Sequence, residues 1–193
     1  MSNIELNGVH HLALVCRDME RTVDFYTNVL NLKLTKGFDL PGYGQHFFFD
    51  MGNGSELAFF WFNDAPEASP GVASAKSIVG SGAGSISSAH GSMNHVAFDV
   101  PPDKIAAFRE EIEAKGVDCS PIVNHNDVVT GEEDRTAKEA SEKTWLQSFY
   151  FFDPDGIMLE FCATLQPGLP NVDLPVNEKG IKANGEPVTG ATQ

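Results

Sequence analysis

The sequence predicts an α+β fold in which one β-α-β-β-β unit occurs twice along the 193-residue chain. Three observations support this duplication. Residues 9–15 and 93–100 both alternate in polarity as strands do, and they carry His11 and His95 at the same point. An amphipathic helical pattern follows each of these strands. Each unit then closes with strands joined by a glycine turn, so the chain contains an internal repeat.

The first unit is expected to span residues 7–63. Its helix begins after Asp18, whose side chain can cap the first turn, and apolar residues recur at helical spacing until about Leu30. Glycine and proline between the later apolar runs indicate tight turns. The strands expected in this unit lie at residues 9–15, 32–38, 45–51 and 56–62.

A linker rich in Gly, Ser and Ala is expected at residues 64–92, because this stretch has no periodicity. The second unit follows at residues 93–164 and contains a charged insertion at residues 126–145 that could hold a short helix. Its main helix ends before Gly116. Residues 165–193 are expected to form an extended or disordered tail. The strands of this unit are expected at residues 93–100, 117–124, 146–152 and 157–162.

The composition excludes several classes of partner. Lys and Arg number 13 and Asp and Glu number 27, so the formal charge is −14 and the surface should repel nucleic acid and anionic membranes. Three cysteines without metal-type spacing suggest reduced thiols. No signal peptide or spanning segment is visible. We therefore expect a cytoplasmic protein, acting on a small molecule as a homodimer or higher homo-oligomer.

The residues themselves suggest a metal site. Glu160 lies in the last strand between Leu159 and Phe161, where a carboxylate is costly unless it is paired, exposed or metal-bound. If each unit curls its sheet into a cup, His11, His95 and Glu160 would line the concavity. Such a set leaves coordination positions open, which suits Fe(II) oxygen chemistry or Mn, Zn or Ni as Lewis acids. The alternative is a structural role for each residue.

Three segments, VHHLALVCRDMERTVDFYTNVLNL, MNHVAFDV and SFYFFDPDGIMLEF, resemble the vicinal oxygen chelate superfamily of glyoxalase I, fosfomycin-resistance proteins and type I extradiol dioxygenases. The resemblance implies paired βαβββ modules that form a cupped mixed sheet around a divalent metal, with helices on the outer faces. It also implies that His11, rather than His10, joins His95 and Glu160 as a metal ligand.

Within that superfamily, a ligand set of two His and one Glu resembles those of the extradiol dioxygenases and of the fosfomycin-modifying enzymes. Glyoxalase I should carry a fourth, carboxylate ligand where this chain has Ala58. Phe149, Tyr150 and the following Asp153-Pro154 resemble the later part of the extradiol signature. Two pocket histidines of that signature are absent, however, and the corresponding positions hold Ser141 to Lys143 and Ser55 to Glu56.

We therefore expect a metal-dependent, catechol-cleaving dioxygenase whose substrate chelates the metal through neighbouring oxygens. Fe(II) is the first choice of metal, and Mn(II), Zn(II) or Ni(II) are alternatives. His46 is the expected proton shuttle, because imidazole titrates near neutrality, and Tyr150 is expected to hydrogen-bond the substrate. The rival functions are a redox-neutral lyase or isomerase and a metal-free protein that sequesters small molecules.

Overall fold

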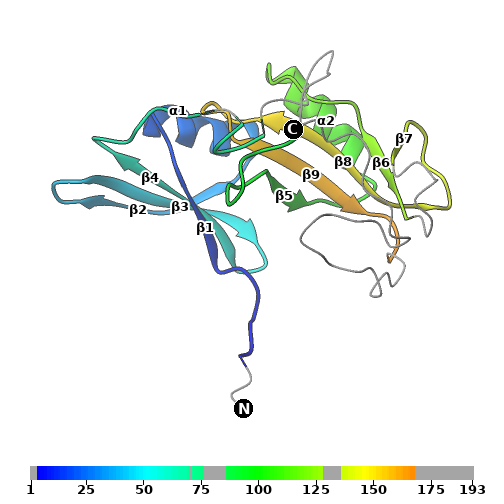
Figure 1. Ribbon diagram of the computed structural model, residues 1–193, viewed down its shortest axis with the longest axis horizontal. Coiled ribbons are helices and arrows are strands. Elements are labelled where there is room, and N and C mark those ends of the chain that lie inside the picture. Colours follow the sequence, from blue (N-terminus) through cyan, green and yellow to red (C-terminus); the bar gives the residue numbers. More distant parts are fainter. Residues whose placement is uncertain (1–3, 70, 76–85, 128–135, 168–193) are drawn as a thin grey trace.

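The structure is a computed structural model that describes residues 4–69, 71–75, 86–127 and 136–167 (Figure 1). Residues 128–135 of the expected insertion and most of the expected tail lie outside the described residues, and the described part of the insertion holds a short strand at Thr136–Ala137 but no helix. No helix in the described ranges is both long and apolar enough to cross a lipid bilayer.

The first sheet holds four strands in the order β1-β4-β3-β2. β1 pairs with β4 in parallel, and the other strand pairs of this sheet are antiparallel. The helical segment lies in the connection from β1 to β2. α1 continues into a π-helical turn, η1, that ends before a left-handed Asn31. These elements are β1 (His11–Val15), α1 (Met19–Asp24), η1 (Phe25–Val29), β2 (Lys33–Leu40), β3 (Gly44–Gly52) and β4 (Ser55–Phe62).

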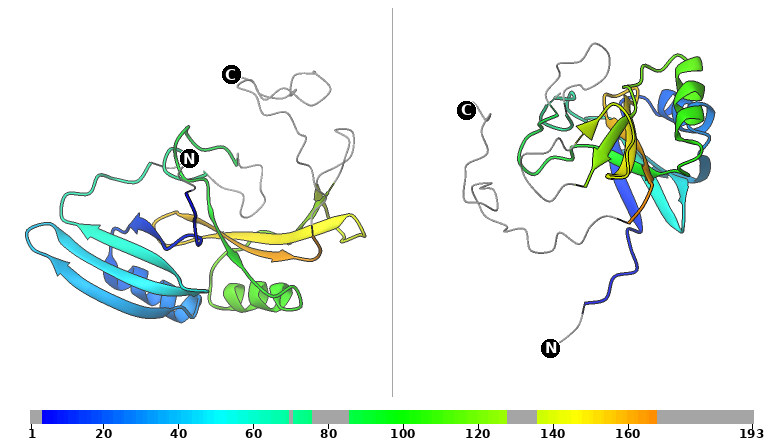
Figure 2. Two further views of the ribbon diagram at one scale, coloured as in Figure 1. Left: turned by 90° about the horizontal axis from the view of Figure 1, so that it is seen from below. Right: turned by 90° about the vertical axis from the view of Figure 1, so that its right-hand side faces the viewer.

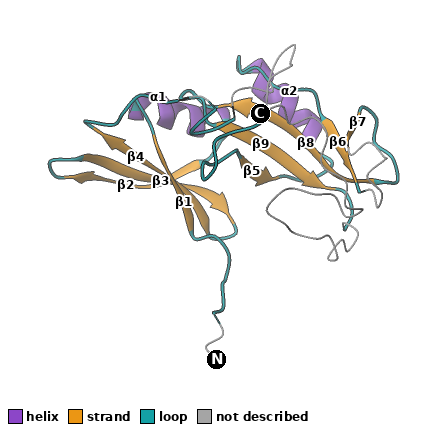
Figure 3. Cartoon of the chain, viewed as in Figure 1, coloured by secondary structure: helices purple, strands orange, loops and turns teal. Residues whose placement is uncertain are grey.

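The second sheet repeats this arrangement and adds one strand, in the order β5-β9-β8-β6-β7. β5 pairs with β9 in parallel, as β1 does with β4. Its elements are β5 (Val96–Asp99), α2 (Ile105–Ala114), β6 (Val123–Asn126), β7 (Thr136–Ala137), β8 (Thr144–Phe152) and β9 (Met158–Thr164). Two mixed sheets with one helical segment each confirm the predicted α+β class and the paired βαβββ modules (Figure 3).

Two strands of the second sheet begin later than the sequence predicts. The strand expected at residues 93–100 begins only at Val96, because the Asn94 carbonyl bonds to Ser74 and Ala75 instead of a neighbouring strand. The strand expected at residues 117–124 begins only at Val123. Pro121 has no N–H to donate and interrupts the ladder between Ser120, whose N–H donates to the Tyr150 carbonyl, and the start of the strand at Val123.

Both helical segments cover the same side of the two sheets, as Figure 1 and Figure 2 show. The core lies between the helical segments and the sheets. Phe108 of α2, for example, contacts Phe161 of β9, with ring centroids 6.1 Å apart. The Lys115 side chain donates to the Val29 carbonyl at 2.9 Å, which links the two helical segments. The largest fully buried side chains are Tyr26, Phe49, Phe59, Phe149 and Phe151.

The predicted turn after β8 connects the two modules. The Asp153 carboxylate accepts the backbone N–H groups of Asp155 and Ile157 at 2.9 and 2.8 Å, which closes the turn. Its other oxygen accepts the Tyr26 hydroxyl at 3.1 Å, and the Arg17 N–H donates to Asp155 at 2.9 Å. The first helical segment is therefore fixed against the second sheet, and the faces opposite the helices are left for chemistry.

Candidate metal centre

The second module brings two of the three predicted ligands together. His95 Nε2 lies 2.9 Å from Glu160 Oε2. The parallel pairing of β5 with β9 sets Ala97 opposite Glu160, so the residue that precedes β5 lies at the end of the same strand pair. Glu160 is only 4% exposed, whereas the His95 side chain is 34% exposed. The carboxylate of the pair is therefore buried, whereas its imidazole remains partly exposed to solvent.

Hydrogen bonds keep the buried Glu160 ionised. Burial raises the pKa of its carboxyl, but hydrogen bonds from His95, Ser148 and Tyr150 outweigh burial and lower that pKa below its ordinary value. Tyr150 lies directly opposite Glu160 in the β8–β9 ladder. Burial, together with the charge of Glu160, raises the pKa of Tyr150 to about 12, so its hydroxyl remains a donor at neutral pH.

His125 also belongs to this group, although the sequence analysis did not select it. Its Nε2 lies 2.8 Å from the Ser148 hydroxyl, which is itself 3.3 Å from the Tyr150 hydroxyl. Burial lowers the pKa of His125, and the negative charge of Glu160 opposes this shift only in part. The pattern that could have indicated this position of His125 is the two-residue period of β6. Val123 pairs with Ser148, and His125, two residues later, lies on the same face of the sheet as Val123.

The third predicted ligand, His11, lies on the other sheet. It is exposed on β1, and its contacts are the ring of Phe48, at a centroid distance of 5.8 Å, and Nδ1 of His10 at 2.9 Å. His10, which was not the expected ligand, lies just before β1 and is exposed as well. Within the described ranges, no three His, Cys, Asp or Glu side chains gather closely enough to hold a metal ion.

The His95–Glu160 pair nevertheless fits a divalent ion in its chemistry and its spacing. Nitrogen and oxygen ligands each about 2.1 Å from one ion, at a right angle, are about 3 Å apart. The observed 2.9 Å separation matches that value without rearrangement. The pair can therefore occupy two adjacent coordination positions, and the remaining ligand has to come from elsewhere.

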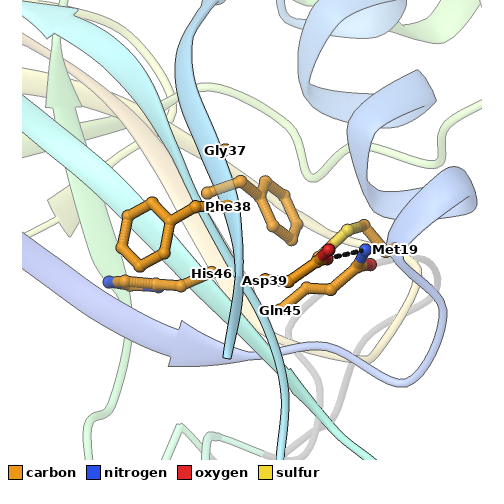
Figure 4. A pocket seen from close by; sticks show the side chains of 7 residues that line it. Met19, Gly37, Phe38, Asp39, Gln45 and His46 are labelled. Carbon is orange, nitrogen blue, oxygen red and sulfur yellow. Dashed lines mark hydrogen bonds between the residues drawn. The ribbon is translucent and has the colours of Figure 1, made fainter. Parts of the chain in front are cut away.

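His46 lies in the first module and is 7% exposed. Its Nδ1 is 2.8 Å from the Phe59 carbonyl, which can only accept, so Nδ1 carries the proton and Nε2 has the lone pair in the neutral ring. The ring stacks on Phe60 at a centroid distance of 3.6 Å. His46 is also among the residues that line a cavity of about 270 Å³ in the first module, namely Met19, Gly37, Phe38, Asp39, Gln45, His46 and Phe47. In Figure 4 its ring lies beside Phe38 on one side of the strand, whereas Met19, Asp39 and Gln45 lie on the other side.

The family model described as the Glyoxalase/Bleomycin resistance protein/Dioxygenase superfamily matches residues 8–161, which include nearly all of both modules and all three predicted ligands. The chain belongs to this superfamily. Its members act on small molecules, bind divalent metals and are usually enzymes.

Known members of the superfamily resemble the chain to different extents. The "Putative ring-cleaving dioxygenase MhqE" of Bacillus subtilis is 31% identical over 120 residues, which are 59% of this chain and 33% of that protein. The chain thus spans about a third of this relative's length. A glyoxylase/bleomycin resistance protein/dioxygenase domain from Frankia sp. has a TM-score of 0.57 at 15% identity, covering 83% of this chain and 99% of its own. The fosfomycin resistance protein FosX from Listeria monocytogenes, in complex with Mn(II), has a TM-score of 0.50 at 19% identity, with coverages of 83% and 96%. Both structures support the fold alone.

Proposed function

We propose that the chain is a divalent-metal-dependent enzyme that cleaves a catechol-like ring with O₂. The observation that carries this proposal is the ionised Glu160 carboxylate, held 2.9 Å from the His95 imidazole and opposite the Tyr150 hydroxyl. Buried carboxylates of this kind need a cation or strong donors. The similarity to a relative named as a putative ring-cleaving dioxygenase supports the choice of reaction.

The complete centre in this proposal is shared between two copies of the chain. Because the described residues bring no third His, Cys, Asp or Glu to the His95–Glu160 pair, we assign the third ligand position to His11 of a second copy of the chain. β1 is an edge of the first sheet and β5 is an edge of the second. A two-fold arrangement that places one copy's β1 beside the other's β5 juxtaposes the two histidines.

The exposed surface of the first sheet supports this association. Val15 is 46% exposed and Phe38 is 43% exposed, and the strand register places both on the same face as His11. Large apolar side chains left exposed on one sheet face indicate an interaction surface. A second copy that covers them would also bring its own His95–Glu160 pair to this face.

When bound, an Fe(II) ion would supply a chelating position for two neighbouring substrate oxygens and the electron density that O₂ requires. Glu160 and His95 would hold the cation. The Tyr150 hydroxyl donates a hydrogen bond to Glu160 and can transfer this hydrogen bond to a substrate oxygen. His125, partly buried and with a lowered pKa, is suited to accept a substrate proton near neutral pH.

His46 keeps its proposed role as a proton shuttle, but the register limits its reach. His46 pairs with Phe60, which pairs with Val15, so His46 is four residues along the ladder and two strands across from His11. At about 3.3 Å per residue and 4.8 Å per strand, these steps amount to a separation of about 16 Å. His46 would therefore act on the far end of a substrate, or through intervening groups.

Metal analysis and oxygen uptake test the proposed function together. Protein purified without oxygen should contain Fe(II) close to one ion per chain, whereas His11→Ala and Glu160→Ala should lose most of it. With a catechol, the wild-type protein should consume one O₂ per substrate molecule without an added reductant. Equal metal content in all three proteins would contradict the ligand assignment.

The same experiment separates the rival functions. A protein that binds metal at these residues but consumes no O₂ with any catechol would be a redox-neutral lyase or isomerase. A protein that binds small molecules but no metal would be a sequestering protein. Either outcome overturns ring cleavage, and the second also overturns the metal centre.

A further inference from the structure

Asn94, directly before His95, has an amide whose orientation is fixed by its partners. Its Nδ2 donates to the Ile86 carbonyl at 2.6 Å and to the Ser88 hydroxyl at 3.2 Å. A backbone carbonyl only accepts, so the nitrogen end of the amide must face Ile86. The oxygen end therefore faces His95, where Oδ1 lies 2.7 Å from Nδ1.

This orientation determines where the His95 imidazole carries a proton. An amide oxygen has no hydrogen, so the short contact requires a proton on Nδ1 of His95. The other nitrogen, Nε2, is aimed at Glu160 at 2.9 Å; it donates to that carboxylate in the metal-free protein and would give up this proton to a bound cation. Contacts on both ring nitrogens leave the imidazole no freedom to rotate about its Cβ–Cγ bond. Metal-ligating histidines are commonly oriented by such a second hydrogen bond.

The backbone of Asn94 is anchored as firmly as its side chain. Its carbonyl accepts the Ser74 hydroxyl at 3.0 Å and the Ala75 N–H at 3.3 Å. The same Ser74 hydroxyl accepts the N–H of Met158 at 3.1 Å, two residues before Glu160 on β9. Ser74 is 5% exposed and Ala75 is 2% exposed. Parts of the inter-module segment on both sides of residues 76–85 thus bind Asn94 next to the candidate metal centre.

The geometry points to Asn94 as the positioning residue of His95: its amide oxygen holds the proton on Nδ1 and presents Nε2 for coordination. The ligand role of His95 rests on the proposed function above, whereas the hydrogen bond itself does not. The first test is therefore made on the metal-free protein, and a metal titration follows.

The first test is the exchange of the His95 Nδ1 proton, observed by NMR on protein with ¹⁵N-labelled histidine and assigned with His95→Ala. In the wild type this proton should be present and should exchange slowly with water. In Asn94→Ala it should exchange at least about tenfold faster, because its acceptor is gone. Asn94→Asp keeps an oxygen acceptor for Nδ1 but loses the donor to the Ile86 carbonyl, so its exchange rate should fall between those of the wild type and Asn94→Ala.

Two control variants separate positioning from a general loss of structure. Asn28→Ala removes an exposed amide that donates to Asp24 at 2.6 Å and should leave the His95 proton unchanged. Ser74→Ala removes the hydroxyl that contacts the Asn94 carbonyl but spares the Asn94 side chain, so it should also leave the exchange rate near wild type. An equal effect of Ser74→Ala and Asn94→Ala would overturn the role of the amide.

The second test is calorimetric titration of the full-length metal-free protein with Mn(II). Asn94→Ala should bind Mn(II) about 10- to 100-fold more weakly than the wild type. If His95→Ala and Glu160→Ala bind Mn(II) as the wild type does, the proposed metal centre is wrong, but the exchange result still stands. If those two variants lose Mn(II) and Asn94→Ala does not, the role of Asn94 alone is refuted.

If Asn94→Ala does not fold, the NMR measurement on the wild-type protein alone can still refute the inference. A His95 ring that carries its proton only on Nε2, or whose Nδ1 proton exchanges as fast as that of the exposed His10, would contradict the inferred hydrogen bond.

Discussion

At the scale of single residues, the chemistry of the candidate centre depends on Glu160 being buried and ionised at once. Burial alone would favour the neutral acid, which is a poor metal ligand. Donors on three sides reverse that preference, and one of them, Tyr150, keeps its proton because its own pKa is raised to about 12. The carboxylate is thus prepared for a cation before one binds.

Tyr150→Phe tests the importance of this donor. The variant loses the hydroxyl that bonds Glu160 and that could pass to a substrate oxygen, and kcat/KM for catechol cleavage should fall about 10- to 100-fold. Metal content should stay near that of the wild type, because His95 and Ser148 still bond the carboxylate. Tyr43→Phe, at a side chain that is 71% exposed, is the matched control. An unchanged kcat/KM in Tyr150→Phe would remove Tyr150 from the site.

At the scale of elements, the start of β3 lies so close to the backbone of β4 that one of its positions, Gly44, has no room for a side chain. A Cβ at Gly44 would lie 1.8 Å from the Trp61 carbonyl oxygen on β4. That oxygen belongs to the backbone of a paired strand, so it cannot move aside cheaply. A Cβ at Gly37 on β2, in contrast, would lie 3.6 Å from Phe47, which is an ordinary contact.

Gly44→Ala should therefore lower the free energy of unfolding by on the order of 3 kcal/mol, because the strand pair must separate to admit the methyl group. Gly37→Ala should change it by no more than about 1 kcal/mol. Denaturant titration of both variants compares the two values. Equal effects at the two positions would show that β3 and β4 do not approach as closely as described.

The Asp153 turn gives stability a pH dependence. Burial raises the pKa of this 5% exposed carboxyl to about 6, from an ordinary value of 3.8, although the N–H groups of Asp155 and Ile157 oppose the shift. The folded state therefore holds the proton more tightly than the unfolded chain does. The stability that Asp153 contributes is full below about pH 4 and is lost as pH rises through about 6, by up to about 3 kcal/mol.

Asp153→Asn should remove this dependence, since a neutral amide can still accept from the turn while it never ionises. The free energy of unfolding of the variant relative to wild type should increase as pH rises from 4 to 7. Asp118→Asn, at an exposed carboxyl, provides the control in the same denaturant titrations. A variant difference that stays constant across this range would contradict the raised pKa.

At the scale of the whole molecule, a centre shared between two subunits makes a distinct prediction for mixed dimers. His11→Ala and Glu160→Ala chains should each be inactive alone. When they are unfolded together and refolded at equal amounts, half of the dimers are mixed, and each mixed dimer has one centre with all its ligands. About one quarter of the wild-type activity should return.

Complementation of this kind cannot arise if each chain builds its own centre, because every chain in the mixture lacks one ligand. Activity that stays at the level of the separate variants would therefore place the whole site within one subunit. The control is a mixture of His95→Ala and Glu160→Ala chains, whose lost ligands lie on the same module, and this mixture should not recover.

Most of the fold could be predicted because its signals are local. The two-residue alternation of β1 and β9, the helical spacing after Asp18 and the turn residues from Asp153 to Gly156 each depend on near neighbours in sequence. The late start of β5 could not be predicted, because it results from contacts between Asn94 and Ser74, which are twenty residues apart in sequence. The part of His125 in the centre was missed for the same reason, since its partner Ser148 is on another strand.

The sequence by itself determined that two β-α-β-β-β modules exist, that His11 and His95 hold equivalent positions in them, and that Glu160 lies on the last strand. These properties follow from periodicity and turn chemistry, which act over a few residues. Only the tertiary structure decided that Glu160 faces His95, Tyr150 and Ser148 while His11 lies on the other sheet. Which side chains meet depends on strand order and on the packing of whole modules, and no local pattern specifies either.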